Sequence, residues 1–356
     1  MKENYQSMER NPPTISVIMP VYNGAQFLRE AIVSVINQSF TDFEFIIIND
    51  GSTDDSARII REYEQQESRI KFINQSKNSG LIEVLNLGLS LAKGKYIARM
   101  DADDISLPNR FEIQYKFLVT HVEIGVVGSN VHFIDSSGRR TSNFVNNPRL
   151  PQTPNQINWS LCFSCCLMHP TIMARRELLI DAGGYNKLAK HAEDYDLWVR
   201  MSATTKFYNL PQKLLLLRRH KTNITVVHID TTLANSRRIS QNHLSHFLDY
   251  EISYDLLAVF WKHGSIDKEL TPRIIKIYED LLNVFRFNFL LNSEETRFIK
   301  KDIVRRIVEL LFQGNTRFQD YKALLIYAGR LNLAEVCKNY FKIKIRILWK
   351  RVKQLL

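Results

Sequence analysis

Hydrophobic and polar residues follow one another along the first half of the chain in the order expected of strands separated by helices. Short β-branched runs predict strands over residues 14–21, 43–48, 69–73, 95–100 and 124–135. Between these runs, apolar residues recur at helical spacing and predict helices over residues 25–38, 55–67, 80–92 and 105–122. This alternation is typical of βαβ units, in which a largely parallel sheet is covered by helices on both faces.

The pattern changes near residue 225. A further α/β stretch runs from 157 to about 219 and ends in the apolar segment KLLLLRR. Beyond it, helical periodicity predicts the segments 231–262, 271–291, 294–313, 316–328 and 331–356, with breaks at Gly264, Gly314 and Gly329. The sequence therefore predicts an α/β domain over residues 1–225 and a mainly α-helical C-terminal domain over residues 226–356.

Polar residues directly follow three of the predicted strands. Tyr22-Asn23, Asn49-Asp50 and the segment DADD at 101–104 stand at these strand ends, where sheets of this class bind their ligands. The carboxylates of DADD repel each other unless they share a hard divalent cation such as Mg²⁺ or Mn²⁺. An acidic cap for the helix that follows is the alternative, and the motif alone leaves both interpretations open.

Composition narrows the class of protein. The 356 residues carry 48 Lys and Arg against 37 Asp and Glu, a net charge of +11, which favours anionic partners such as nucleotides, nucleic acid or a membrane surface. With only 13 Gly and 10 Pro, the chain is not collagen-like or broadly disordered. The four cysteines are too few and too bunched for a disulfide framework, and the polar N-terminus lacks the apolar core of a signal peptide. No run of about 18 apolar residues occurs, so we expect a cytoplasmic protein without a membrane-spanning segment.

Several ordered motifs together resemble a known enzyme family. VIMPVYNGAQFLREAIVSVINQSF, IINDGSTDDS and NSGLIEVLNLGLSLAKGKYIARMDADDISLPNRFE are similar to the donor half of family 2 glycosyltransferases of the GT-A fold. SCCLMHPTIM, AGGY and HAEDYDLWVRM resemble the acceptor half. The resemblance implies a Rossmann-like domain with a mixed, mainly parallel sheet, its nucleotide-binding half at about 14–110 and its acceptor half at 111–225. It also implies transfer of a sugar from a nucleotide-diphosphate donor to a hydroxyl group, with inversion at the anomeric carbon.

The resemblance assigns roles to individual residues. Those expected to bind the nucleotide are Pro20, Val21, Tyr22, Asp50, Lys77, Asn78, Asp101, Ala102 and Asp103. Mn²⁺ or Mg²⁺ is expected at Asp103, with Asp101 and His220 as further ligands. Arg218, Arg219 and His220 are expected to close over the diphosphate, and a basic surface turn is the alternative for these three residues. For Asp50 the alternative is a turn before Gly51, and for Lys77 and Asn78 it is a solvated turn.

A second acidic cluster lies in HAEDYDLW, which holds Glu193, Asp194 and Asp196. Inversion in one displacement requires a base within hydrogen-bond reach of the acceptor hydroxyl, on the face opposite the leaving group. The resemblance places this base at Asp194, with Glu193 orienting the acceptor or the base. Acidic residues in the first turn of a helix also stabilise the helix dipole, which is the structural alternative.

Cys162, Cys165, Cys166 and His169 lie within eight residues, whereas structural zinc ligands usually come from two separated pairs. We therefore favour a core segment lined by small cysteines over a zinc site, with His169 helping to shape the acceptor pocket.

The C-terminal segment 338–356 carries seven basic and no acidic residues. As a helix, this segment places Phe341, Ile345 and Leu348 on one apolar stripe, although Ile343 and Ile347 then lie among the charged residues. As a strand, residues 341–347 alternate regularly between apolar and basic side chains. A basic amphipathic segment indicates contact with the inner face of a membrane, near a lipid-linked acceptor. A helix that packs back on its own domain accounts for the same pattern.

The leading hypothesis is therefore an inverting, metal-dependent hexosyl- or N-acetylhexosaminyltransferase. It would take a nucleotide-sugar donor, most simply a UDP-sugar, and a glycan or lipid-linked acceptor in the synthesis of a surface polysaccharide. A sugar nucleotidyltransferase would need a glycine-rich phosphate loop after the first strand, which is missing. The remaining alternative is a non-catalytic protein that binds nucleotide-sugar or nucleic acid, but the chain has no zinc-finger, RRM or KH signature, so we expect no nucleic-acid partner.

Overall fold

The computed structural model describes residues 11–141, 150–221, 223, 227–261, 269–310 and 318–355, with the side chains of 259, 318–321 and 341–355 left out. The chain forms two compact units, an α/β unit of residues 1–152 and 166–232 and a helical unit of residues 153–165 and 233–356. The sequence places the boundary at 225; in the structure the units divide at 232, and the segment 153–165 belongs with the helices. The predicted breaks at Gly264 and Gly314 lie outside the described residues.

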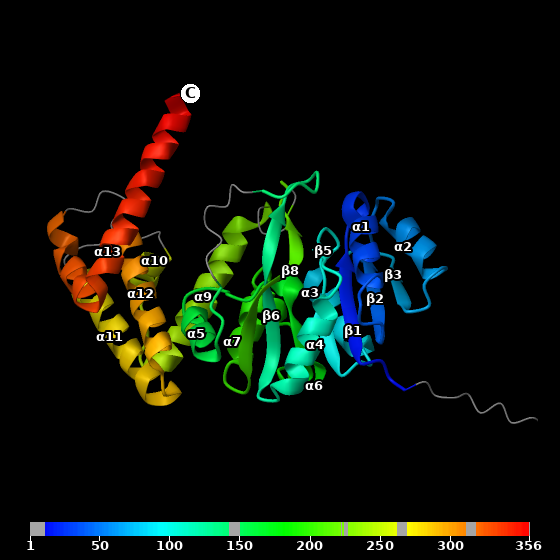
Figure 1. Ribbon diagram of the computed structural model, residues 1–356, viewed down its shortest axis with the longest axis horizontal. Coiled ribbons are helices and arrows are strands. Elements are labelled where there is room, and N and C mark those ends of the chain that lie inside the picture. Colours follow the sequence, from blue (N-terminus) through cyan, green and yellow to red (C-terminus); the bar gives the residue numbers. More distant parts are fainter. Residues whose placement is uncertain are drawn as a thin grey trace, which may run out of the picture. The chain divides into compact units, whose positions relative to one another are not determined.

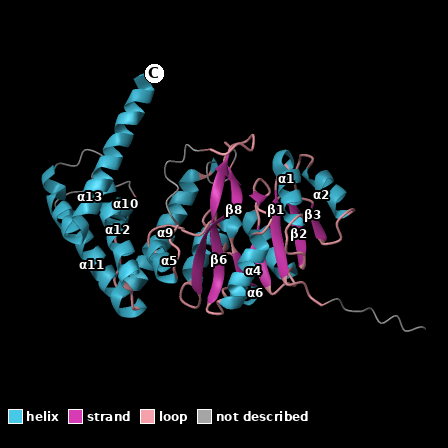
Figure 2. Cartoon of the chain, in the orientation of Figure 1, coloured by secondary structure: helices cyan, strands magenta, loops and turns pink. Residues whose placement is uncertain are grey.

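The α/β unit alternates strands and helices as the hydrophobic pattern predicts (Figures 1 and 2). Its strands are β1 Ile15–Val21, β2 Phe43–Asp50, β3 Ile70–Gln75, β4 Tyr96–Arg99, β5 Ile105–Ser106, β6 Ile124–Ile134, β7 Met173–Arg175 and β8 Lys206–Arg218. Its helices are α1 Ala25–Ile36, α2 Ser56–Glu64, α3 Leu81–Leu91, α4 Arg110–Thr120, η1 His169–Thr171, α6 Arg176–Asp181, η2 Lys187–Ala189 and α7 Glu193–Met201.

All eight strands form one mixed sheet in the order β3-β2-β1-β4-β7-β6-β8-β5. The pairs β2–β3, β1–β2, β1–β4 and β6–β8 are parallel, and the other three are antiparallel. The α/β fold with a mixed, mainly parallel sheet is thus confirmed. Since β1, β2 and β4 run in the same direction, their carboxyl ends meet at one edge of the sheet, and the motifs that follow them meet there too.

Both faces of the sheet are covered, which explains the continuous apolar runs of β1 and β2. Alternate residues of β1, such as Val17 and Met19, pack in one core with Leu28 and Ile32 of α1. On the opposite face, Ile18 and Ile48 point at α3, whose Gly88 lies so close that an added Cβ would come within 2.6 Å of Ile18 Cγ2. This close approach fixes α3 against the strands that carry the predicted donor motifs.

The helical unit consists of α5 Pro154–Leu161, α9 Ile229–Leu248, α10 Tyr254–Phe260, α11 Leu270–Phe289, α12 Ser293–Leu310 and α13 Phe318–Leu355. The first turn of α9 falls in the α/β unit. Trp159 of α5 is fully buried here and donates from Nε1 to Asp302 at 2.9 Å, while Thr153 Oγ1 and Asn155 Nδ2 donate to Glu295 at 2.8 and 2.9 Å. A buried polar group needs such partners, so the segment 153–165 is an integral part of this core.

Three local predictions need correction. The break expected at Gly329 lies at Asn332 instead, because the backbone is still helical at Gly329. The expected helix over 105–122 begins only at Arg110, because Ile105 and Ser106 first pair with Leu216 and Leu215 of β8 as a short strand. The strand alternative for 341–347 is wrong, since the backbone is helical to Leu355, with a single non-helical residue at Asn332. Within the described residues, no helix combines the length and the apolar character needed to cross a bilayer.

Gly51 allows two loops at the carboxyl edge of the sheet to touch. It follows β2 with a φ of +65°, and an added Cβ would lie 2.5 Å from the carbonyl carbon of Lys77 and 2.6 Å from the amide nitrogen of Asn78. Only glycine tolerates both the left-handed backbone and this approach.

We therefore expect Gly51→Ala to lower the free energy of unfolding by more than Gly183→Ala does. Gly183 has a similar φ of +76° but nothing within 4 Å of its added Cβ, so it reports the backbone strain alone, about 1–3 kcal/mol. The clash at Gly51 should add about 1–3 kcal/mol more. Urea unfolding measures both variants, and equal losses would contradict the close approach of the two loops.

Candidate active site

The three aspartates that follow β4 lie together. Ligand oxygens of Asp101, Asp103 and Asp104 are within 4.8 Å of one another. Asp101 forms an ion pair with Arg99, the last residue of β4. Asp104 is buried, and its Oδ2 atom has no hydrogen-bond partner in the part of the chain that the structure describes.

The electrostatics of this cluster suit a hard cation. Burial, followed by the repulsion of Asp101, raises the pKa of Asp103, and the same two causes raise the pKa of Asp104 well above its ordinary range. A divalent metal ion such as Mg²⁺ or Mn²⁺ prefers carboxylate oxygens and would offset this repulsion. The residues present therefore fit the expected metal, and Asp104 joins the predicted pair Asp101 and Asp103.

The segment after β8 reaches the same cluster. His220 Nε2 lies 2.8 Å from Asp103 Oδ2, and Asn223 Nδ2 donates to that oxygen at 3.1 Å. The structure thus brings His220 to the aspartates, as the resemblance implies. Asn223 was not predicted; the available signal is its position three residues after His220 in HKTN, and its Nδ2 lies 3.2 Å from His220 Nε2.

Arg218 does not lie where the sequence places it. Instead of closing over a diphosphate, its guanidinium is buried and donates to Glu30 Oε2 at 2.6 Å and to the Asp103 carbonyl oxygen at 2.8 Å. The next residue, Arg219, lies over the ring of Phe133, 5.1 Å from its centroid.

The donor-side motifs meet at the carboxyl ends of β1 and β2. The Asp50 carboxylate accepts hydrogen bonds from Ser79 N at 2.6 Å, Ser79 Oγ at 2.9 Å and Gly80 N at 2.9 Å. Asp50 therefore has the structural role in a turn that the sequence offered as the alternative. It fixes the loop that carries Lys77 and Asn78, both of which are exposed. The three predicted nucleotide residues Asp50, Lys77 and Asn78 are brought together.

The residues after β1 differ in what they can offer a ligand. Tyr22 is 54% exposed and Pro20 is partly exposed, whereas the side chain of Val21 packs in the core. Ala102 is close to this turn, because a Cβ added at Gly24 would lie 3.5 Å from the Ala102 Cβ. Tyr22 can therefore present its ring to a nucleobase, while Val21 can contribute only backbone atoms.

The second acidic cluster opens α7. Glu193, Asp194 and Asp196 all stand in its first turn, and Asp196 is already paired with Arg200 at 2.8 Å. Burial, followed by the charge of Asp194, raises the pKa of Glu193 to about 7, and the Arg99 guanidinium partly opposes that rise. Because Arg99 also lowers the pKa of Asp103, this buried cation interacts with both carboxylate clusters.

The predicted acceptor motif AGGY, residues 182–185, is held by α3. Asn86 Nδ2 donates to the Tyr185 carbonyl oxygen at 2.9 Å, and Asn86 Oδ1 accepts from the Tyr185 amide at 2.8 Å. The Tyr185 hydroxyl lies 2.8 Å from His169 Nε2, so this ring nitrogen has a partner. Burial lowers the pKa of His169 well below its ordinary range, which keeps the imidazole neutral.

Comparison with known proteins identifies the family of this chain. The family described as Glycosyl transferase family 2 matches residues 16–179. The O-antigen biosynthesis glycosyltransferase WbnJ of Escherichia coli is 34% identical over 210 residues, which cover 58% of this chain and 80% of that protein. The chain belongs to glycosyltransferase family 2.

Solved structures agree on the fold of this transferase. TarS of S. aureus in complex with UDP-GlcNAc is 17% identical, with a TM-score of 0.54, over 93% of this chain and 91% of that chain. The mannosyltransferase PcManGT of Pyrobaculum calidifontis, in complex with GDP-Man and Mn²⁺, is 15% identical with a TM-score of 0.52, over 93% of this chain and 88% of that chain. At this identity the likeness shows the fold alone, which is that of GT-A enzymes.

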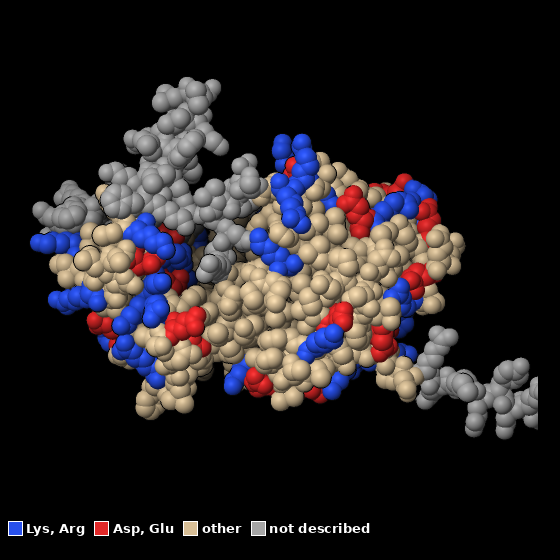
Figure 3. Space-filling model, in the orientation of Figure 1, with Lys and Arg blue, Asp and Glu red and all other residues tan. Residues whose placement is uncertain are grey.

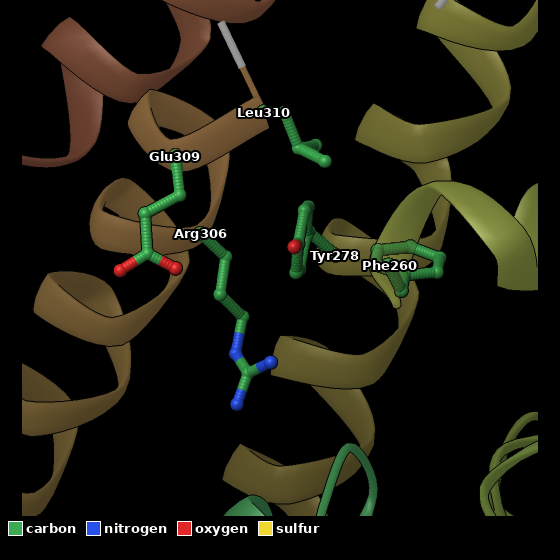
Figure 4. A pocket seen from close by; sticks show the side chains of 5 residues that line it. All are labelled: Phe260, Tyr278, Arg306, Glu309 and Leu310. Carbon is green, nitrogen blue, oxygen red and sulfur yellow. The ribbon is translucent and has the colours of Figure 1, made fainter. Parts of the chain in front are cut away.

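A small cavity in the helical unit of the transferase offers no alternative site. Phe260, Tyr278, Arg306, Glu309 and Leu310 line it (Figure 4), and its volume is about 10 Å³. This is room for about one water molecule, far too little for a sugar nucleotide.

The raised pKa of Glu193 predicts a pH-dependent effect on stability. Between its ordinary pKa of 4.5 and about 7, the folded transferase holds a proton that the unfolded chain has lost, so the free energy of unfolding falls as the pH rises through this window. Glu193→Gln has no such proton. Its stability relative to the wild type should therefore be higher at about pH 8 than at about pH 5.

Urea unfolding at both pH values measures this difference. Glu177→Gln, at an exposed position of α6, is the matched control and should show no such change. A difference between Glu193→Gln and the wild type that stays constant with pH would contradict the buried, proton-binding state of Glu193.

Proposed function

We propose that this family 2 glycosyltransferase is an inverting, divalent-metal-dependent enzyme whose donor is a uridine diphosphate sugar. The observation that carries the proposal is one buried cation, Arg99, whose charge acts on both carboxylate clusters. Asp101 is ion-paired with Arg99, and Arg99 lowers the pKa of both Asp103 and Glu193. The metal-binding and proton-accepting groups therefore share one electrostatic environment.

On the donor side, Tyr22 would cover the nucleobase, while Asp50, Lys77 and Asn78 form the loop wall beside it. Pro20, the Val21 backbone and Ala102 complete this edge. Asp103, with Asp101, Asp104 and His220, would hold Mn²⁺ or Mg²⁺, which neutralises charge on the departing diphosphate when it is bound. These residues orient the donor so that its anomeric carbon faces the acceptor side.

On the acceptor side, Asp194 would take the proton of the attacking hydroxyl group. Glu193 stands next to it, and burial together with the charge of Asp194 raises the pKa of Glu193 to about 7, so the Glu193 carboxyl can hold a proton beside the base at neutral pH. Tyr185 and His169 are both buried, and the charges of Asp194 and Glu193 act on the Tyr185 hydroxyl. In-line attack with the base opposite the diphosphate would invert the anomeric centre.

Relatives and neighbours support the classes of donor and acceptor. TarS was solved with UDP-GlcNAc, which supports a UDP-hexose or UDP-N-acetylhexosamine donor, and PcManGT with GDP-Man and Mn²⁺, which supports the metal. The name of WbnJ supports an acceptor in surface polysaccharide synthesis, either a glycan or a lipid-linked glycan.

Two substitutions separate the roles of the clusters. Asp103→Asn should weaken Mn²⁺-dependent UDP binding by at least about tenfold, because a metal ligand loses its charge. Asp194→Asn should bind Mn²⁺ and UDP as the wild type does, yet slow sugar transfer by about 10²–10⁴-fold. Calorimetric titration of UDP with and without Mn²⁺, with GDP for comparison, measures binding, and release of UDP from a panel of UDP-sugars measures turnover.

Absence of UDP and GDP binding to the wild type under every metal condition would contradict the proposed donor site. Wild-type turnover by Asp194→Asn would contradict its role as the base.

We further propose that the end of α13 binds the inner surface of an anionic membrane. The helix continues to Leu355, and its last 19 residues carry seven of the eleven net positive charges. Over α11 and α12, basic and acidic side chains are mixed (Figure 3), so the excess of positive charge is concentrated at the end of α13. Such binding would bring the enzyme to a lipid-linked acceptor.

Deletion of residues 338–356 should release the protein from vesicles that contain phosphatidylglycerol, because about 1 kcal/mol per basic residue is lost. Co-sedimentation at low and high salt measures the release. The double variant Lys300→Gln, Lys301→Gln removes charge from α12 instead and should stay bound. Unchanged co-sedimentation of the deletion variant would contradict membrane binding through this helix.

A further inference from the structure

Arg218, at the end of β8, contacts two residues of the aspartate cluster. It is 2% exposed. Its backbone amide donates to Asp104 Oδ1 at 2.8 Å, and its Nε atom donates to the Asp103 carbonyl oxygen at 2.8 Å. Arg218 thus contacts both the side chain of Asp104 and the backbone of Asp103.

The rest of the guanidinium is fixed from other directions. One terminal nitrogen donates to Glu30 Oε2 at 2.6 Å, and the other donates to the Asp135 carbonyl oxygen at 3.3 Å. The group also lies over the ring of Phe27, 4.5 Å from its centroid. These contacts leave the guanidinium a single orientation, which α1, β8 and the turn after β6 impose together.

Phe27 connects Arg218 to His220. The Phe27 ring packs against the His220 imidazole, with the two centroids 5.1 Å apart. Because His220 Nε2 lies 2.8 Å from Asp103 Oδ2, the surface under the imidazole helps to decide where this nitrogen points. Arg218 therefore helps to position His220 in two ways: through the Phe27 ring that lies between them, and because His220 follows it by two residues in the chain.

We propose that Arg218 is a positioning residue for the divalent metal ion: it fixes Asp103, Asp104 and His220 in the arrangement that binds the cation. The inference rests on the metal site of the proposed function. Being a cation, Arg218 does not itself bind the metal. Its effect comes from holding the groups that carry or orient the ligand oxygens, as partners behind metal ligands do elsewhere.

Lysine cannot replace arginine here. The guanidinium donates along three separate directions to Asp103, Glu30 and Asp135, whereas a lysine ammonium is a single compact centre at the end of a flexible stem. Arg218→Lys therefore keeps the positive charge but cannot make all three hydrogen bonds at once. It tests whether the positioning of the aspartate cluster, rather than the charge alone, matters for metal binding.

Arg69 offers a matched control at the opposite end of the strands. It pairs with Glu67 at 2.7 Å, donates to the Ile36 carbonyl oxygen at 2.9 Å and lies over the ring of Phe43 at 4.3 Å. It thus has the same three kinds of partner as Arg218 but stands just before β3, at the amino edge of the sheet. Arg69→Lys reports the structural cost of the same substitution away from the aspartates.

The experiment is titration of Mn²⁺ into the full-length protein, followed by electron paramagnetic resonance of free Mn²⁺, together with a thermal melt of each variant. Arg218→Lys should weaken Mn²⁺ binding by about 10–100-fold. Arg69→Lys should leave the Mn²⁺ affinity unchanged. If Arg218→Lys fails to fold, Glu30→Ala is the deciding variant. It removes only the exposed partner of Arg218, so it should leave the fold intact and weaken Mn²⁺ binding severalfold.

The outcomes distinguish this inference from the proposed function. Wild-type Mn²⁺ affinity in a folded Arg218→Lys, or in Glu30→Ala when that variant decides, would overturn the inference and leave the metal site intact. Equal loss of affinity in Arg218→Lys and Arg69→Lys would also overturn it, because the effect would then be general destabilisation. No Mn²⁺ binding by the wild type would overturn the metal-dependent function, and the inference with it.

Discussion

Mutual repulsion among Asp101, Asp103 and Asp104 is the constraint around which the α/β unit is arranged. Carboxylates within 4.8 Å of one another, one of them buried, are unfavourable unless cations and hydrogen-bond donors surround them. Arg99 pairs with Asp101, and Arg218 contacts the other two. Behind them, Arg110 donates to the Arg99 carbonyl oxygen at 2.8 Å, although burial lowers its pKa to about 9. Buried arginines thus hold in place a cluster that a metal ion would complete.

The donor and acceptor motifs are connected by α3 as well as by the sheet. Asp50 accepts a hydrogen bond from the amide of Gly80, the residue before α3. Within the helix, the Asn86 side chain forms hydrogen bonds with both the amide and the carbonyl oxygen of Tyr185. Since Gly88 seats the helix on Ile18 and Ile48, α3 can hardly shift without disturbing β1 and β2. The two halves of the site are therefore positioned by one rigid element, which suits a reaction that requires donor and acceptor in line.

Periodicity and motif spacing predict most of this unit but not its supporting contacts. Strand ends at Asp50 and Asp101 can be read from apolar runs, because parallel strands bring their carboxyl ends together. The burial of Arg218 cannot be read in this way, since a basic pair after an apolar strand looks the same whether its side chains face solvent or contact the backbone of Asp103. Asn223 and Asn86 were missed for a similar reason: a polar residue whose partner is many residues away leaves no local pattern. The membership of 153–165 in the helical unit depends on contacts with Asp302 and Glu295, more than 130 residues further along the chain.

Because of those contacts, the helical unit is built from two separate parts of the chain, residues 153–165 and 233–356. Its core includes a segment that lies between β6 and β7 in the sequence, so the chain passes between the two units three times, near residues 152, 165 and 232. Trp159 can bury its ring and satisfy its indole N–H only when α12 supplies Asp302, whose pKa is held below its ordinary range by Arg306 and Arg305. Removing the helices would leave α5 with an unsatisfied apolar face in the middle of the transferase sequence. The core of the helical unit is therefore complete only when the inserted segment 153–165 packs with α11 and α12, which come more than 100 residues later in the chain.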